Sequence, residues 1–268
     1  MGKEYIAGIS TSDGWAQLAV FEMKDREATL LHVEEYARND NDPLWFLRGV
    51  LAPSSRELKK LSRIAVALEY SSVFLHAFPM DTSLTQAEQN EHVHWELSNL
   101  ISGYQAKEHI CDLHVLKTHA REQVAEILVV AVRRSLVFEI QRAISRRQLE
   151  IGLVDTGYFA TEHALLASYP EIKINTSALV VVGDDRTDIG WNFNGRLIRY
   201  ETTRDGSPGG VVRKIRSQLS ELPVSEVYLS GRVLPAAYVE AIGEELGLPV
   251  TPLNPFRRPI RTSGCRTL

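Results

Sequence analysis

Two short polar turns carry the residue types that hold phosphate groups in proteins. The first, Gly8–Asp13 (GISTSD), and the second, Val180–Thr187 (VVVGDDRT), each end a run of small and β-branched residues. Successive backbone N–H groups in such a turn form a concave anion site, and glycine permits close approach of the ligand. An alternating strand follows both turns. The pattern therefore predicts two phosphate-binding turns, one in each part of the chain.

Further residues near these turns have two readings each. Gly209 and Gly210 precede an expected helix, whose N-terminus would attract an anion, although an ordinary helix start explains the pair equally simply. Asp184 and Asp185 offer carboxylates for a metal ion, but aspartates in turns commonly bond their own backbone. We therefore expect neither a catalytic residue nor a metal ligand at Asp184 or Asp185.

Two other groups of charged residues lie away from the turns. Arginines between residues 133 and 147 predict either a solvated helix face or a docking surface for an acidic partner. The arginine-rich tail from Phe256 onward predicts a frayed terminus, with contact to anionic lipid as the alternative. Metal binding is not predicted for the histidines in the middle of the chain, because their spacing points them to different faces. These histidines are His92, His94, His109, His114 and His119.

Composition excludes several classes of protein. The chain has 268 residues, a net charge of −4 and a pI near 6.1, which argues against a nucleic-acid-binding protein. Two cysteines far apart in sequence favour a reducing cytoplasm, and no signal peptide or membrane-spanning segment is expected. The sequence also lacks the GxxxxGK[ST], GxSxG and HExxH motifs of other catalytic sites.

The elements that must position the two turns occur twice. Strands expected at 4–9, 15–22 and 28–36 form one meander, and strands at 178–182, 188–193 and 196–201 form another. Strand–helix units follow each meander. The sequence therefore predicts an α/β protein with a duplicated lobe and a cleft between the lobes that both turns face.

Three local signals fix other elements. A helix is expected over 42–51, with Asp42 as cap and Pro43 at its first position. Thr85 and Glu88 form a capping box that starts an amphipathic helix. Gly247 is expected to end a helix over 235–246.

The order and spacing of these motifs resemble the actin-like ATPase superfamily, and within it the PilM family of type IV pilus assembly proteins. The resemblance implies duplicated actin-like, ribonuclease H-like lobes over 1–170 and 171–268, an interlobe cleft and an inserted α/β subdomain at about 72–150. It covers nearly the whole chain, but the final helix of the family has no counterpart. The matching stretches are Gly8–Asp13, Arg63–Pro79, Glu88–Ile101, Asp112–Leu116, Leu128–Val132, Val154–Asp155, Val180–Gly183 with Thr187, Leu229–Arg232, Leu246–Gly247 and Asn254–Phe256.

Departures from the family pattern point to function. Ser10 and Val181 stand where the resemblance places aspartates that organise Mg²⁺ and the attacking water. Ser12 and Arg232 stand where it places glycines beside the phosphates and the base. Loss of the carboxylates removes most of what phosphoryl-transfer catalysis requires. The turns are therefore expected to be a phosphate cradle with weak or lost nucleotide binding.

Two hypotheses follow from the resemblance. The first is a scaffold, a pseudo-ATPase that binds a short cytoplasmic peptide of a membrane-anchored pilus or secretion protein and lies near the inner membrane through that partner. The alternative is an enzyme, a weak ATPase or divergent kinase that binds ATP with or without Mg²⁺. Homo-oligomers remain open, and no nucleic-acid partner is expected. The expected cofactor-binding residues are Ser10, Thr11, Ser12, Gly183, Asp184, Gly209, Gly210, Gly231 and Arg232.

Overall fold

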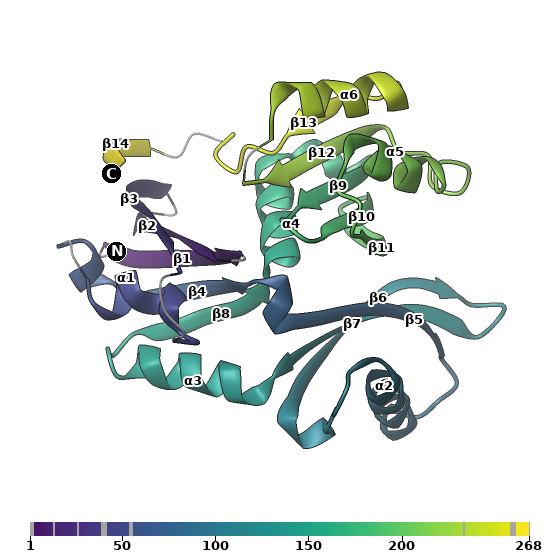
Figure 1. Cartoon of the computed structure of the whole chain (residues 1–268), viewed down its shortest axis with the longest axis horizontal. Helices are drawn as coiled ribbons and strands as arrows, with labels where there is room; N and C mark the ends of the chain where they lie inside the picture. Colours follow the sequence, from purple (N-terminus) through teal and green to yellow (C-terminus); the bar gives the residue numbers. More distant parts are fainter. Residues whose placement is uncertain are drawn as a thin grey trace.

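The protein contains three β-sheets with helices packed on them (Figure 1). The structure is a computed structural model that describes residues 3–12, 14–25, 27–38, 42–53, 56–232, 234–257 and 261–267. Asp13 of the first polar turn and residues 258–260 and 268 of the arginine-rich tail lie outside the described residues.

The first sheet has six strands in the order β14-β3-β2-β1-β4-β8. β1 pairs antiparallel with β2 and parallel with β4, so one strand links the meander to the crossover part of the sheet. The strands are β1 (Glu4–Ser12), β2 (Trp15–Lys24), β3 (Glu27–Ala37), β4 (Arg63–Leu68), β8 (Glu150–Thr156) and β14 (Arg261–Thr267).

The second sheet repeats this arrangement in the order β11-β10-β9-β12-β13. β9 pairs antiparallel with β10 and parallel with β12, as β1 does with β2 and β4. The predicted duplicated α/β fold is therefore confirmed. The strands are β9 (Thr176–Val182), β10 (Thr187–Phe193), β11 (Arg196–Thr203), β12 (Glu226–Gly231) and β13 (Val250–Pro252).

A third sheet, in the order β5-β7-β6, is inserted between β4 and β8 along the chain. It carries α2 (Gln86–Leu100), whose N-terminus has the predicted capping box of Thr85 and Glu88. The strands are β5 (Val73–Asp81), β6 (His109–His119) and β7 (Val124–Arg133). The expected insertion at about 72–150 contains this sheet, and the division of the chain into two lobes near residue 170 stays a prediction.

Helix α4 (Gly157–Ser168) stands between the first and second sheets (Figure 1). Tyr158 and Leu165 on this helix are fully buried in one hydrophobic cluster with β1, β4 and β9 side chains. The cluster also contains Ile140 and Ile144 of α3, which packs beneath β8. The remaining helices are α1 (Arg48–Leu51), α3 (Arg134–Ser145), α5 (Pro208–Arg216) and α6 (Ala236–Leu246).

Two expectations about local structure are wrong. The helix expected over 42–51 is a 3-10 turn at Trp45–Leu47 followed by the single turn of α1. The Asp42 carboxylate accepts a hydrogen bond from the backbone N–H of Leu44 at 2.8 Å, so it forms a local turn instead of a helix cap. The tail is not frayed over its described part, because β14 pairs parallel with β3.

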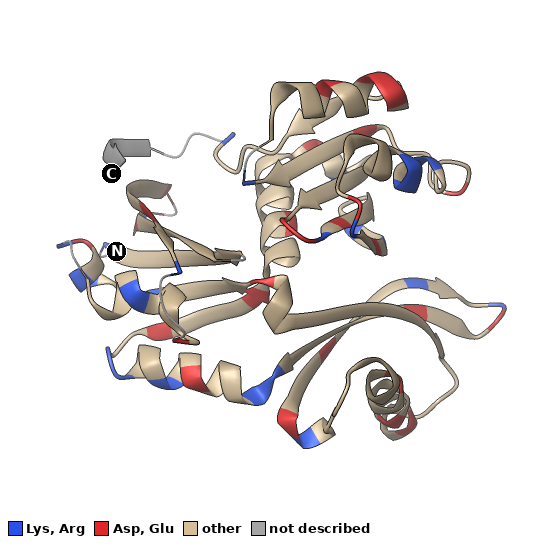
Figure 2. Ribbon diagram, in the orientation of Figure 1, with Lys and Arg blue, Asp and Glu red and all other residues tan. Residues whose placement is uncertain are grey.

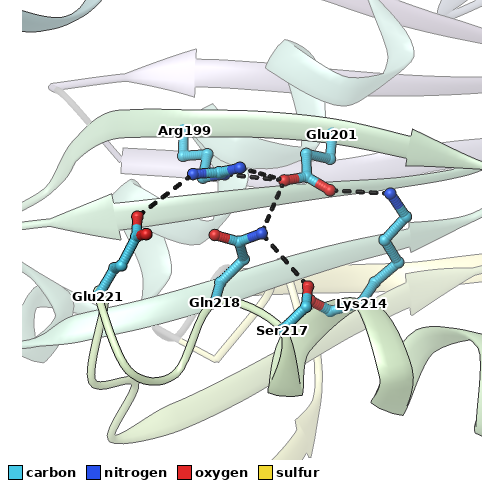
Figure 3. A network of polar contacts seen from close by, with 6 residues as sticks. All are labelled: Arg199, Glu201, Lys214, Ser217, Gln218 and Glu221. Atoms are coloured by element: carbon cyan, nitrogen blue, oxygen red, sulfur yellow. Dashed lines mark hydrogen bonds and ion pairs between the residues drawn. The ribbon is translucent and has the colours of Figure 1, made fainter.

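A polar network fixes α5 and the loop after it to strand β11 (Figure 3). Both carboxylate oxygens of Glu201 accept bonds, from Arg199 at 2.8 Å and from Lys214 at 2.9 Å. The Gln218 amide donates to the same carboxylate at 3.2 Å, and Glu221 lies 3.8 Å from Arg199. Charge-assisted bonds of this kind hold the helix in one position on the sheet.

Glu162 is a titratable side chain inside the core that α4 shares with the second sheet. Its side chain is 6% exposed, and its Oε1 atom has no hydrogen-bond partner among the described residues. Burial raises the pKa of Glu162 from 4.5 to about 7, the charge of Asp155 adds to this, and the Asn192 amide lowers it. The carboxyl group is therefore held more easily in its neutral form.

We expect Glu162 to make stability fall with rising pH. Because its pKa is higher in the folded than in the unfolded chain, its contribution is fully present below pH 4.5 and is lost as the pH rises through about 7. The difference corresponds to about 3 kcal/mol. Glu162→Gln should flatten the pH dependence of the free energy of urea unfolding between pH 5 and 8. Glu139→Gln, at an exposed position on α3, is the control and should leave that pH dependence as it is in the parent chain. An unchanged profile in Glu162→Gln would contradict this.

Candidate functional site

The two polar turns face one cavity of about 570 Å³, named here the central cavity. It lies at the carboxyl ends of β1, β4, β9 and β12, the edge at which α/β sheets usually bind ligands. Seven of the nine expected cofactor-binding residues line it, namely Ser10, Thr11, Ser12, Gly183, Asp184, Gly231 and Arg232. Whether they bind a cofactor stays a prediction.

Gly209 and Gly210 do not line the central cavity. They form the first turn of α5 after the cap Ser207, whose hydroxyl accepts from the N–H of Gly210 at 3.1 Å. A Cβ atom at Gly210 would lie 2.4 Å from the backbone oxygen of Asp205, so the glycine permits a close approach of that residue. The Asp205 carboxylate pairs with Arg213 and accepts from Ser207. The Asp205 carboxylate is thus the anion that lies beside the N-terminus of α5.

Polar groups of both turns are used within the fold. The Thr11 hydroxyl accepts from the N–H of Glu69 at 2.7 Å and donates to the carbonyl of Ala67 at 3.3 Å. The N–H of Gly183 donates to the carbonyl of Arg186 at 2.9 Å, which closes the second turn on itself. These two donors stabilise the turns and have less capacity left for an anion.

Arg186 introduces a positive charge at the floor of the central cavity. Its guanidinium donates to Asp188 at 2.8 Å and to the hydroxyl of Tyr200 at 2.6 Å, and it lies 4.6 Å from the ring centre of Tyr70. The Asp188 side chain is fully buried. Burial, and then the charge of Asp188, raise the pKa of the Tyr70 and Tyr200 hydroxyls well above the ordinary value. Asp188 is therefore a buried carboxylate whose partner Arg186 is 24% exposed in the cavity lining, beside two tyrosines that stay neutral.

Arg232 lines the central cavity and joins its two sides. Its guanidinium carbon lies 3.8 Å from the ring centre of Trp15, and its Nη2 atom donates to Glu35 Oε1 at 2.7 Å. This bond lowers the pKa of the Glu35 carboxyl, against the effect of partial burial. A side chain that follows β12 of the second sheet therefore contacts β2 and β3 of the first sheet.

Sequence reasoning missed several residues that line the central cavity, among them Trp15, Glu69, Tyr70 and Arg186. Trp15 lies just after the first turn and Arg186 lies in the second, so an aromatic and a basic residue beside the turns were the signals available in the sequence. Glu69 and Tyr70 directly follow β4, in a stretch without a recognisable motif. Only the topology brings them to the turns.

A second hollow of about 370 Å³, named here the side groove, lies between the first sheet and the inserted part. Buried Trp45 and Phe46 line it together with Leu136 of α3, and Arg38 and Arg133 add positive charge. Thr11, Leu68, Glu69 and Ser71 line both the side groove and the central cavity. One short wall thus separates the two.

The described residues give no cluster of three or more His, Cys, Asp or Glu side chains placed to hold a metal ion. Among the histidines of the inserted part, His94 contacts the Tyr104 hydroxyl at 2.6 Å and His92 packs on Phe78. Over the same described stretches, no helix is long and apolar enough to cross a membrane.

Comparison of the fold with solved structures identifies actin-like ATPase folds. A "PilM-PilN type IV pilus biogenesis complex" matches with a TM-score of 0.70 and 15% identity, over 96% of this chain and 90% of the other. A Bacteroides thetaiotaomicron protein with an actin-like ATPase fold matches at 0.58, with 15% identity over 95% and 93%. The ethanolamine utilization protein EutJ from Carboxydothermus hydrogenoformans matches at 0.53, with 11% identity over 97% and 89%.

The sequence was compared with curated proteins and with protein families. No curated protein matches it. The profile of the family described as "Type IV pilus assembly protein PilM" matches residues 47–211, which is more than half of the chain. This stretch contains Leu68, Glu69 and Ser71 of the shared wall, the inserted sheet, α4 and the second polar turn. The chain therefore belongs to the family of the type IV pilus assembly protein PilM, and its fold is that of the actin-like ATPases.

Proposed function

We propose that this protein is a cytoplasmic scaffold of a type IV pilus or related machine that binds a short peptide of a membrane-anchored partner. The family and the solved complex of a PilM with PilN support a partner of the PilN kind. The observation that carries the proposal is the side groove, which combines an aromatic floor with basic walls. Through such a partner the protein would lie at the inner membrane.

The side groove has the features that an extended peptide needs. Trp45 and Phe46 line it but are only 3% and 5% exposed, so they form a fixed apolar base to which Pro43 and Leu136 add apolar lining. Arg38 and Arg133 lie on its walls with Glu69, which favours a peptide that carries at least one carboxylate. Apolar pockets with a charged rim are a recurring way to bind peptides.

The arginines that flank α3 contribute unequally to this groove. Figure 2 shows basic residues at both ends of the helix. Arg133 lines the groove at the N-terminal end, whereas exposed Arg146 at the other end does not. Arg147 donates to the carbonyl of Leu51 at 3.3 Å, so its charge is engaged within the fold. Arg133 is therefore a sharper test of peptide binding than Arg146 and Arg147.

We expect Arg133→Glu to weaken peptide binding about tenfold, because it replaces a charge-assisted contact with repulsion. A fluorescent peptide with the sequence of the cytoplasmic segment of the PilN-like partner from the same genome would be titrated with the full chain, and anisotropy would report affinity. The melting temperature should change little, since exposed charges contribute little to folding.

Arg146→Glu is the matched control for this prediction. It reverses the same charge near the same helix but outside the side groove. Affinity retained in Arg146→Glu and lost in Arg133→Glu would support the groove. Equal loss in both variants would move the binding site to the outer face of α3, and full affinity in Arg133→Glu would refute the groove as the docking site.

We further propose that the central cavity has weak or no affinity for Mg²⁺–ATP. Ser10 and Val181 line the cavity without supplying carboxylates. The carboxylates that do line it, from Glu69, Asp184 and Asp185, form no cluster placed to hold a metal ion among the described residues. Thr11 and Gly183 use their polar groups within the fold, and Arg232 covers Trp15. This set of residues does not fit a magnesium–triphosphate group, which needs oxygen ligands and free backbone donors.

Calorimetric titration of the full chain with Mg²⁺–ATP should give little or no heat of binding, and hydrolysis should not exceed the background. Ser10→Asp with Val181→Asp should tighten binding by restoring metal ligands. Ser10→Asn with Val181→Asn has similar volume without charge and should not. Sub-micromolar, Mg²⁺-dependent binding by the unmodified chain would favour the alternative, an ATPase or kinase.

A further inference from the structure

We propose that Arg232 is a built-in latch that holds the central cavity closed without a bound ligand, by joining the end of β12 to β2 and β3. Proteins with two lobes around a cleft usually close when a ligand bridges both sides. Here a side chain of the protein makes that bridge. The latch lies in the central cavity, whereas the proposed peptide binds in the side groove.

The latch has two contacts on the first sheet. The Arg232 guanidinium lies over Trp15, with its carbon 3.8 Å from the ring centre, and it reaches Glu35 Oε1 at 2.7 Å. The Gln17 amide lies 3.4 Å from the other carboxylate oxygen of Glu35, so both oxygens have a partner. Trp15 and Gln17 line the cavity from β2. The acceptor Glu35 on β3 and the ring of Trp15 on β2 are therefore held by one pair of adjacent strands.

The position of the latch also restricts access to Trp15. A flat aromatic ring that stacked on Trp15 from this side would have to displace the guanidinium. Arg232 and Glu35 are each 39% exposed, so water competes with their ion pair and the latch is reversible. Arginine suits this role because its planar group stacks and donates at once, which a lysine ammonium does not do.

A second arginine of the cavity lining also joins the two sheets. Arg186, just before β10, pairs with fully buried Asp188 and lies over the ring of Tyr70, which follows β4. The Arg186 side chain is 24% exposed, against 39% for Arg232, and its carboxylate partner is inaccessible to water. Arg232, whose partner Glu35 is also 39% exposed, is therefore the contact that opens and closes.

The test measures a distance across the cavity by pulsed electron paramagnetic resonance. Spin labels at exposed Lys24 on β2 and Glu240 on α6 would be placed in a chain with Cys111 and Cys265 replaced by serine. We expect one narrow distribution that Mg²⁺–ATP does not change. Arg232→Gly should raise the ratio of open to closed molecules about tenfold, which corresponds to about 1.4 kcal/mol. The measured distribution should then contain more of the longer label-to-label distances.

Two further variants make the outcome decisive. Glu35→Gln removes the ion pair and leaves the stacking contact, so a smaller shift in the same direction is expected. Arg204→Gly removes a charge from the same cavity without touching Trp15 or Glu35, so the distribution should stay narrow. Identical distributions for Arg232→Gly and the parent chain would overturn the latch. So would equal shifts in Arg232→Gly and Arg204→Gly, or closure that requires Mg²⁺–ATP.

Discussion

The burial of α4 between two sheets is the constraint on which the remaining structure depends. Tyr158 and Leu165 are fully buried in a cluster that includes side chains of β1, β4 and β9. Both sheets bury apolar side chains against this helix, and without it those side chains would be exposed to water. Since β1 and β9 each begin the repeated unit, their carboxyl ends are brought to one cavity, and the polar turns that follow face each other there.

That arrangement explains why much of the fold was predictable from sequence and part of the site was not. The alternating strands, the capping box at Thr85 and the stop at Gly247 act over a few residues, so local patterns identified them. The same reasoning failed for the short helix α1. The Asp42 carboxylate accepts a hydrogen bond from the N–H of Leu44 and therefore does not cap a helix. Tyr70 and Glu69 reach the cavity through the pairing of β4 with β1, a long-range contact that no local pattern encodes.

Two cations that line the central cavity are paired with carboxylates of the same chain. Positions that resemblance assigns to acidic metal ligands carry a serine and a valine, while Arg186 and Arg232 bring cations that pair with Asp188 and Glu35 of the same chain. A phosphate cradle works by leaving donors unpaired until the ligand arrives. Here the chain satisfies several of those donors itself, which stabilises the folded protein and lowers the gain from any anion.

The wall between the central cavity and the side groove is a single layer of residues with two surfaces. Thr11, Leu68, Glu69 and Ser71 line both hollows, and the bond from the Glu69 N–H to the Thr11 hydroxyl ties this wall to the end of β1. A molecule that displaced the backbone at Glu69 from one side would disturb the hydrogen bond to Thr11, which faces both hollows. Any change in affinity that passed through this wall would be reciprocal, so that each occupant would have the same effect on the binding of the other.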